Sequence, residues 1–160
     1  MKTLILIRHA KSSWKHPVSD IQRPLNKRGK TDAKRVALHT KSVGFPVDAV
    51  FVSPAKRTQE TAKYFIKHWG IDKRICKTID DLYDFSGNDL LGVIKNINDN
   101  YQHIMLFGHN HALTSFVNDF GNRFIDNVPT CGFLLIQFDI EKWADLKQGY
   151  TLYKAFPKEF

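Results

Sequence analysis

Residues 3–7 read TLILI, an apolar run that stops abruptly at Arg8 and His9. Two later stretches repeat this pattern, AVFV at 49–52 and IMLF at 104–107, and each is again followed by polar residues or glycine. Short, nearly continuous apolar runs are typical of strands that are buried on both faces, as in a parallel sheet. The three runs therefore predict the centre of such a sheet.

Helical patterns separate these runs. We expect helices over four stretches, 26–43, 54–68, 86–98 and 111–120. Ser53 as N-cap and Pro54 in the first position are expected to begin the second helix, because both residue types are favoured there. Ser86 followed by Asp89 indicates a capping box at the start of the third helix.

The remaining strands complete an alternating order. Strands are expected at 133–138 and 150–154, and a further short strand ahead of Asp80. Four strand–helix pairs followed by two strands predict an α/β fold, a three-layer α/β/α sandwich with a mostly parallel central sheet. The length, with no repeat or linker, predicts a single domain over 1–160, since domains usually span ~100–200 residues.

Composition narrows the class of protein. Hydrophobic residues at 42% and charged residues at 25% exclude a disordered, collagenous or coiled-coil chain. Lys+Arg 24 against Asp+Glu 16 gives a net charge of +8, which favours anionic partners. Cys76 and Cys131 are too few for a disulfide framework or a cysteine metal site. No apolar run reaches the ~18–20 residues of a membrane span, and we expect a cytoplasmic protein without a membrane partner.

Polar residues follow the buried strands where a ligand is expected. In open α/β sheets ligands bind beyond the carboxyl ends of the strands. Those positions hold Arg8, His9, Ser53, His109 and Asn110. A single histidine at a strand end is more often an ordinary polar residue. Two histidines at equivalent ends, one of them preceded by arginine, indicate a shared site.

Arg57 supplies an independent clue. It lies in the first turn of the predicted second helix, where a cation opposes the helix dipole at a cost of ~0.3–1 kcal/mol. An anion held jointly by Arg57 and Arg8 would compensate, because the planar guanidinium can donate two hydrogen bonds to one phosphate. The alternative is an Arg57–Glu60 pair on a solvated helix face.

Together these side chains fit metal-independent phosphoryl transfer. His9 would attack phosphorus as a neutral imidazole, while Arg8, Arg57 and His109 would surround the phosphoryl oxygens. A carboxylic acid would protonate the leaving group, and the loop with Asp80, Asp81 and Asp84 offers one unless all three are merely solvated. His109 and His111 lack a third partner, so no metal is expected.

Three blocks of this sequence resemble the motifs of the histidine phosphatase superfamily, the phosphoglycerate-mutase-like clan, in the family's order. They are LILIRHAKSSW at 4–14, SPAKRTQETA at 53–62 and FGHNHALT at 107–114. The short length, RPLNKRG at 23–29 and IDNVPTCG at 125–132 are most similar to the SixA-type phosphohistidine phosphatases. The resemblance implies a phosphoglycerate-mutase-like fold.

The resemblance also implies roles for individual residues. His9 matches the nucleophile that becomes phosphohistidine, and Arg8, Arg57 and His109 match the phosphate pocket, with Asn110 beside them in the third block. Asp84 fits best as the family's acid. Ala10 departs from the usual glycine of the first block, and His111 replaces the proline that is common in the third.

We therefore expect a metal-independent phosphatase, without a cofactor, that hydrolyses phosphohistidine on a protein through an intermediate on His9. The chain has no room for the lid segment of larger relatives, so the site should be open and suited to a phosphate on a protein surface. Five basic residues outside the pocket either steer an acidic partner or only solubilise the protein: Lys11, Lys15, Arg23, Lys27 and Arg28.

Two alternatives remain open at this point. One is a low-specificity phosphomonoesterase for small molecules on the same scaffold. The other is a non-enzymatic basic module that binds nucleic acid or a phosphorylated partner. Nucleic acid is not the expected partner, because aromatic residues do not interleave with basic ones along a strand. The sequence makes no prediction about oligomeric state or pathway.

Overall fold

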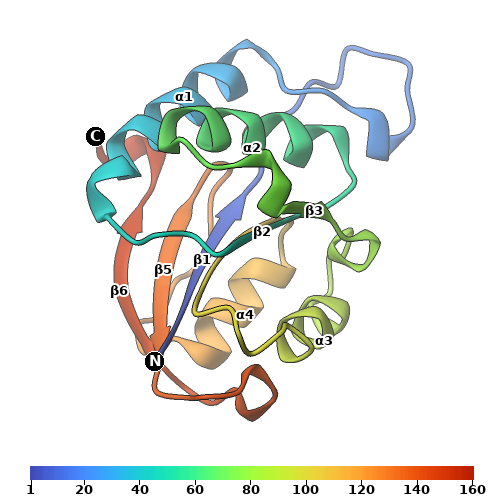
Figure 1. The fold of residues 1–160 in the computed structure, drawn as a ribbon. Coiled ribbons are helices and arrows are strands. Elements are labelled where there is room, and N and C mark those ends of the chain that lie inside the picture. Colours follow the sequence, from blue (N-terminus) through green and yellow to red (C-terminus); the bar gives the residue numbers. More distant parts are fainter.

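The computed structural model describes all 160 residues (Figure 1). The strands are β1 (Lys2–Arg8), β2 (Ala49–Val52), β3 (Cys76–Thr78), β4 (His103–Gly108), β5 (Phe133–Phe138) and β6 (Tyr150–Ala155). The helices are α1 (Lys27–Thr40), α2 (Lys56–Trp69), α3 (Asn88–Lys95) and α4 (Ala112–Phe120), joined by short 3-10 turns such as η1 (Asp20–Gln22). None of the helices has the length and apolar character needed to cross a membrane.

The six strands form one sheet in the order β3-β2-β4-β1-β5-β6. β3, β2, β4 and β1 pair in parallel, and β5 runs antiparallel to both of its neighbours. The predicted α/β class and the mostly parallel sheet are confirmed. The three apolar runs form its neighbouring parallel strands β2, β4 and β1, whose side chains are buried on both faces of the sheet.

Helices cover both faces of the sheet. Figure 1 shows α1 and α2 on one face and α3 and α4 on the other. Side chains of β1 alternate between the two resulting cores, since successive residues of a strand point to opposite faces. Leu4 and Leu6 pack into the core under α3 and α4, whereas Ile5 and Ile7 pack into the core under α1 and α2.

The carboxyl ends of β2, β4 and β1 lie side by side, because these strands are neighbours and parallel. Backbone hydrogen bonds continue past the strands. The amide of His9 donates to the carbonyl of Gly108 at 3.2 Å, and the amide of Ser53 donates to the carbonyl of Phe107 at 3.2 Å. The residues that follow three separate strands are therefore held together at one edge of the sheet.

Two predicted helix starts are wrong. α2 begins at Lys56 with Ala55 as its N-cap, two residues later than expected, because the Ser53 hydroxyl is hydrogen-bonded to His109 instead of capping the helix. α3 has Gly87 as its N-cap and no capping box. Its first turn is instead bound by the carboxylate of Asp84, which accepts a hydrogen bond from the amide of Leu90.

The start of α1 packs directly against the segment that follows β1. Asn26 caps the helix as predicted, since its side chain accepts a hydrogen bond from the amide of Gly29 at 2.8 Å. A Cβ atom on Gly29 would lie 2.1 Å from the carbonyl oxygen of Lys11. Only glycine allows this approach, which explains the glycine of the RPLNKRG stretch.

Candidate active site

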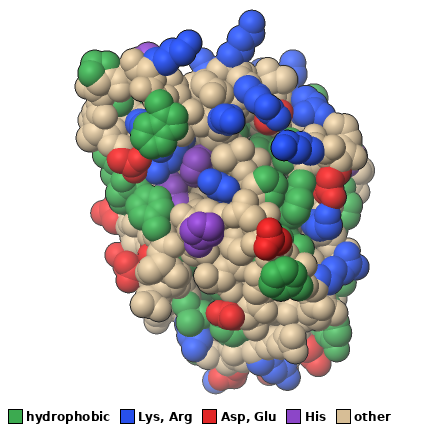
Figure 2. All heavy atoms as spheres, turned by 180° about the vertical axis from the view of Figure 1, so that it is seen from behind, with side chains coloured by type: hydrophobic (Ala, Val, Ile, Leu, Met, Phe, Trp, Pro, Cys, Tyr) green, Lys and Arg blue, Asp and Glu red, His purple; other side chains and the backbone are tan.

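A pocket of about 290 Å³ opens beyond the carboxyl ends of the central strands. It is lined by five of the predicted site residues, Arg8, His9, Arg57, His109 and Asn110. The imidazole rings of His9 and His109 lie with their centroids 5.3 Å apart. Figure 2 shows histidine side chains gathered in a hollow on one face, with many Lys and Arg side chains around its upper part.

The ring of His9 is held in one tautomer. Its Nδ1–H donates a hydrogen bond to the carbonyl of Ala10 at 2.7 Å, so the neutral ring carries its lone pair on Nε2. Burial, with the neighbouring positive charges of Arg57 and Arg8, lowers the pKa of His9 to about 3. The imidazole is therefore in its neutral form at neutral pH. The amide of Ala10 donates to Thr61 on α2, which fixes this turn.

His109 is held by the residue that follows β2. Its Nε2 lies 2.7 Å from the Oγ of Ser53, and its buried Nδ1 has no partner in the chain. The Ser53 hydroxyl also accepts a hydrogen bond from the amide of Ala55, and it can donate its own hydrogen to Nε2. When it does, the hydrogen of the neutral His109 ring lies on Nδ1, where it can be donated to a ligand. Burial and the charge of Arg57 lower the pKa of His109 to about 3.

Arg8 is positioned by the loop ahead of β5. Its Nη1 donates to the carbonyl of Val128 at 2.9 Å, and its buried Nε has no partner. The amide of Cys131, which has a positive φ of 59°, donates to the carbonyls of Arg8 and His9. The IDNVPTCG stretch therefore orients the end of β1.

Asn110 lines the pocket, but its side chain is engaged within the chain. Its Nδ2 donates to Asn127 at 2.7 Å and to the carbonyl of Val128 at 3.3 Å. Its Oδ1 accepts from the amide and the hydroxyl of Thr114. The carbonyl of Val128 is thus shared with Arg8, so Asn110 supports the position of Arg8 rather than offering a free donor.

Arg57 is 2% exposed and does not pair with Glu60. Its Nη2 donates to the carboxylate of Asp20 at 2.9 Å and its Nη1 to the backbone carbonyl of the same residue at 2.6 Å. The Nε of Arg57 is buried and unpartnered. The solvated-face interpretation of Arg57 is therefore wrong, because the guanidinium is buried in the pocket wall.

Asp20 is a pocket residue that sequence analysis missed. Its carboxylate also accepts hydrogen bonds from the hydroxyl of Tyr83 and, at 3.1 Å, from the Nε of Arg23. Partial burial opposes ionisation, but the hydrogen bonds from Tyr83 and Arg57 outweigh it and hold the pKa of Asp20 below its usual range. The only signal in the sequence is the i, i+3 spacing of Asp20 and Arg23, which favours a local ion pair.

Asp84 does not line the pocket. Its carboxylate accepts hydrogen bonds from the amide and hydroxyl of Ser86 and from the amides of Gly87 and Leu90. Burial raises its pKa, but these bonds outweigh that effect and lower it. The structure thus holds the predicted acid ionised at the start of α3 through these four hydrogen bonds, near enough to His109 for its charge to act on that ring.

The mouth of the pocket is aromatic and open. Trp14 is 79% exposed and stacks on Arg23, whose guanidinium carbon lies 3.6 Å from the ring centroid. Phe85 is 46% exposed, and its ring centroid lies 5.1 Å from that of His109. Nothing encloses these rings from outside. His111, next to the site in sequence, is exposed and joins no cluster of residues able to hold a metal ion.

Residues 4–92, more than half of the chain, match the model of the histidine phosphatase superfamily (branch 1). An uncharacterized protein of Mycobacterium tuberculosis is 26% identical over 160 residues, covering 94% of this chain and 98% of that protein. An uncharacterized chloroplastic protein of Arabidopsis thaliana is 44% identical over 63 residues. That match covers 39% of this chain and only 29% of the Arabidopsis protein.

Solved structures share the fold over almost the whole chain. The protein histidine phosphatase SixA in complex with tungstate superposes with a TM-score of 0.79 at 16% identity, covering 98% of both chains. A candidate phosphohistidine phosphatase SixA from Agrobacterium tumefaciens gives a TM-score of 0.81 at 23% identity, covering 98% of this chain and 99% of that one. At these identities the likeness concerns the fold.

Proposed function

The chain belongs to the histidine phosphatase superfamily and is a phosphatase by that membership; we propose that its substrate is a phosphohistidine carried on a protein. The proposal combines three features of the site: a neutral nucleophile, a set of unpaired donors for an anion, and an open mouth.

The unpaired donors carry the proposal. Buried polar side-chain atoms in folded proteins nearly always have a hydrogen-bond partner. Here three buried nitrogens without one, Nε of Arg8, Nε of Arg57 and Nδ1 of His109, belong to residues that line the same small pocket. A phosphoryl group between the two histidines would bring oxygen acceptors and negative charge to this cluster. The pocket is therefore best suited to a tetrahedral anion.

The proposed reaction begins at His9. Its Nε2 lone pair attacks phosphorus, the bond between phosphorus and the substrate nitrogen breaks, and the substrate imidazole leaves with a proton from solvent. The two arginines and His109 stabilise the charge on the phosphoryl oxygens. Water then attacks the phosphoryl group on His9, which releases inorganic phosphate and restores the neutral ring.

The state of the two carboxylates near the pocket agrees with a substrate whose P–N bond is cleaved. Imidazole is a good leaving group once protonated, so a buried carboxylic acid beside the leaving atom is not required. An alkoxide from a sugar phosphate needs such an acid far more. Asp84 is engaged as a cap, and Asp20 is held ionised by Arg57 and Tyr83.

The open mouth favours a protein-borne phosphate over an enclosed metabolite. A basic groove of about 640 Å³ adjoins the pocket and shares Lys11, Ser12 and Trp14 with it. Lys15, Lys27 and Arg28 line the same groove. A small substrate would gain little binding energy there beyond its phosphate, whereas a protein surface would contact the groove as well.

The test compares two substrates. Phosphate release from a phosphohistidine phosphocarrier protein should exceed release from p-nitrophenyl phosphate and from phosphoglycerate in kcat/KM. The variant His9→Gln should lose activity on every substrate, while His39→Gln, at an exposed histidine that lines neither the pocket nor the basic groove, should not. A higher kcat/KM on a small ester would instead make the protein a phosphomonoesterase.

A further inference from the structure

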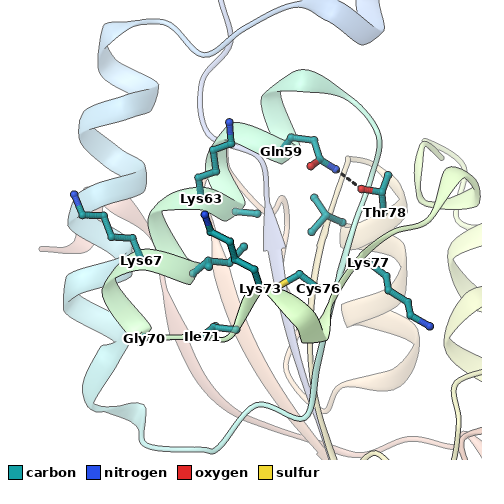
Figure 3. A pocket seen from close by; sticks show the side chains of 12 residues that line it. Gln59, Lys63, Lys67, Gly70, Ile71, Lys73, Cys76, Lys77 and Thr78 are labelled. Atoms are coloured by element: carbon teal, nitrogen blue, oxygen red, sulfur yellow. Dashed lines mark hydrogen bonds between the residues drawn. The ribbon is translucent and has the colours of Figure 1, made fainter.

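A second, larger groove lies beside the site, between α2 and β3 (Figure 3). Its volume is about 820 Å³. The walls carry four exposed lysines, Lys63, Lys67, Lys73 and Lys77, and we call this feature the lysine groove. Figure 3 shows Lys63 and Lys67 projecting from α2 and Lys77 extending from the side of β3.

The charge of the lysine groove is uncompensated. None of the four lysines takes part in an ion pair, and no Asp or Glu lines the groove. The nearest acidic residue in sequence, Asp72, is bound to Arg74. Lys63, Lys67 and Lys73 surround this depression, and Lys77, which also lines the neighbouring groove, adds a fourth positive charge at its edge. Together they create a positive potential that attracts an anionic ligand.

The floor of the groove suits a polypeptide. Apolar side chains, among them Val52, Ala62 and Ile66, form the floor beneath the lysines. β3 is the edge strand of the sheet, so its outer backbone groups are not paired with another strand. An extended segment with acidic side chains can lie along such an edge, with its apolar atoms on the floor and its carboxylates toward the lysines.

The upper end of the groove lies at the same edge of the sheet as the proposed catalytic pocket, although no residue lines both. Gln59 lines its upper end, two residues after Arg57 on α2, and donates hydrogen bonds to Thr78 at 3.0 Å and to the carbonyl of Ser53 at 2.9 Å. Ser53 in turn holds His109. One partner can therefore occupy the groove while it presents a phosphorylated side chain to the pocket.

From these features we infer that the lysine groove docks an acidic, extended segment of the phosphoprotein substrate. The inference rests on the proposed function and adds a class of partner to it. A nucleic-acid strand fits less well, because the groove has neither the aromatic rings nor the arginines on which bases stack. A second copy of this chain fits less well too, because each copy carries a net charge of +8.

Two charge-matched variants test the docking site. The groove variant replaces Lys63, Lys67, Lys73 and Lys77 with Gln. The surface variant replaces four exposed lysines that line neither pocket with Gln: Lys30, Lys34, Lys142 and Lys147. Both variants lose four positive charges. A difference in kcat/KM between them therefore reflects the loss of the groove lysines and not the lower net charge of the protein.

The expected result is specific to protein substrates. The groove variant should lose about tenfold in kcat/KM on an acidic phosphohistidine phosphocarrier, the combined effect of four exposed charge contacts. It should retain wild-type kcat/KM on free phosphohistidine, and the surface variant should retain both. Equal losses in the two variants, or a groove variant that keeps full activity on the phosphocarrier, would overturn the inference.

A binding experiment separates this inference from the proposed function. Cys76 lies half-buried in the groove, whereas Cys131 is buried, so a maleimide reports on Cys76. A short glutamate-rich peptide should slow labelling of Cys76 in the wild type but not in the groove variant, and a glutamine-rich peptide should not slow it. No protection of the wild type would overturn the docking site. Protection in a protein that is inactive on phosphohistidine would overturn only the proposed function.

Discussion

The carboxylate of Asp20 lies 2.9 Å from the guanidinium of Arg57 in the wall of the pocket, although 37 positions separate the two residues in the chain. Arg57 also donates to the backbone carbonyl of Asp20, so one residue engages both of its terminal nitrogens. A phosphate that binds Arg57 must either share the guanidinium with this carboxylate or displace the carboxylate. Asp20 therefore competes with the substrate for the arginine.

The variant Asp20→Asn should bind anions more tightly. It removes the competing charge but keeps a side chain of nearly the same shape. The Asp20 side chain is 45% exposed, so the ion pair is partly solvated and contributes only a modest interaction energy. The inhibition constant for orthovanadate should therefore fall about two- to fivefold. Steady-state inhibition measures it.

The matched control is Asp81→Asn, an exposed acid that does not line the pocket, which should leave the inhibition constant unchanged. If vanadate bound Asp20→Asn more weakly than the wild type, Asp20 would be a positioning residue for Arg57 and not its competitor.

The two buried histidines of the pocket, His9 and His109, should make folding stability depend on pH. Burial lowers the pKa of His9 and of His109 to about 3, whereas an unfolded histidine titrates near 6.5. Between these values the unfolded state binds more protons than the folded state. The free energy of unfolding should therefore fall as the pH is lowered from about 6.5 toward 3.

Urea unfolding at a series of pH values measures this dependence. The double variant His9→Gln, His109→Gln should show a flatter profile, while His16→Gln, His39→Gln, which removes two exposed histidines, should follow the wild type. A wild-type profile equal to that of the His9, His109 variant would mean that these imidazoles are solvated.

Asp84 should matter for stability and not for turnover of phosphohistidine. The variant Asp84→Asn weakens four hydrogen bonds at the start of α3, which should lower the free energy of unfolding by ~1–2 kcal/mol. Its kcat on a phosphohistidine phosphocarrier should stay within about threefold of the wild type, since a general acid is worth at least ~100-fold. A loss of that size with unchanged stability would establish Asp84 as the acid.

Gly29 should be intolerant of any side chain. A Cβ would lie 2.1 Å from the carbonyl oxygen of Lys11, so Gly29→Ala should destabilise the protein by ~1–3 kcal/mol or more through a forced backbone shift. Gly92 in α3 has no atom within 4 Å of a built Cβ. Gly92→Ala should therefore be neutral or stabilising, and thermal unfolding of the two variants should show opposite or clearly unequal shifts.

The central strands were predictable because burial on both faces leaves an unbroken apolar run, as in 49–52 and 104–107. β3 was expected without bounds, since Lys77 and Thr78 are exposed and its three residues show no apolar pattern. The starts of α2 and α3 were misplaced because Ser53 and Ser86 are good caps in isolation. In the fold, Ser53 binds His109 and Ser86 binds Asp84.

The placement of His9 and His109 was predictable because each follows a strand and parallel strands end at one edge of the sheet. Asp20 was not, since its loop has no periodic pattern and its partner Arg57 comes from a distant helix. Asp84 lies in the expected loop, but the amides of Ser86 and Gly87 that occupy its carboxylate depend on the local turn.

The central claim is that His9 carries the phosphoryl group during turnover. The most direct measurement is rapid acid-free quenching with a phosphohistidine phosphocarrier, followed by mass spectrometry of the enzyme's peptides. An acid-labile, base-stable phosphate is expected on His9 and should be absent in His9→Gln. Phosphate on His109 or Ser53, or turnover with no phosphoenzyme and with His9→Gln still active, would contradict it.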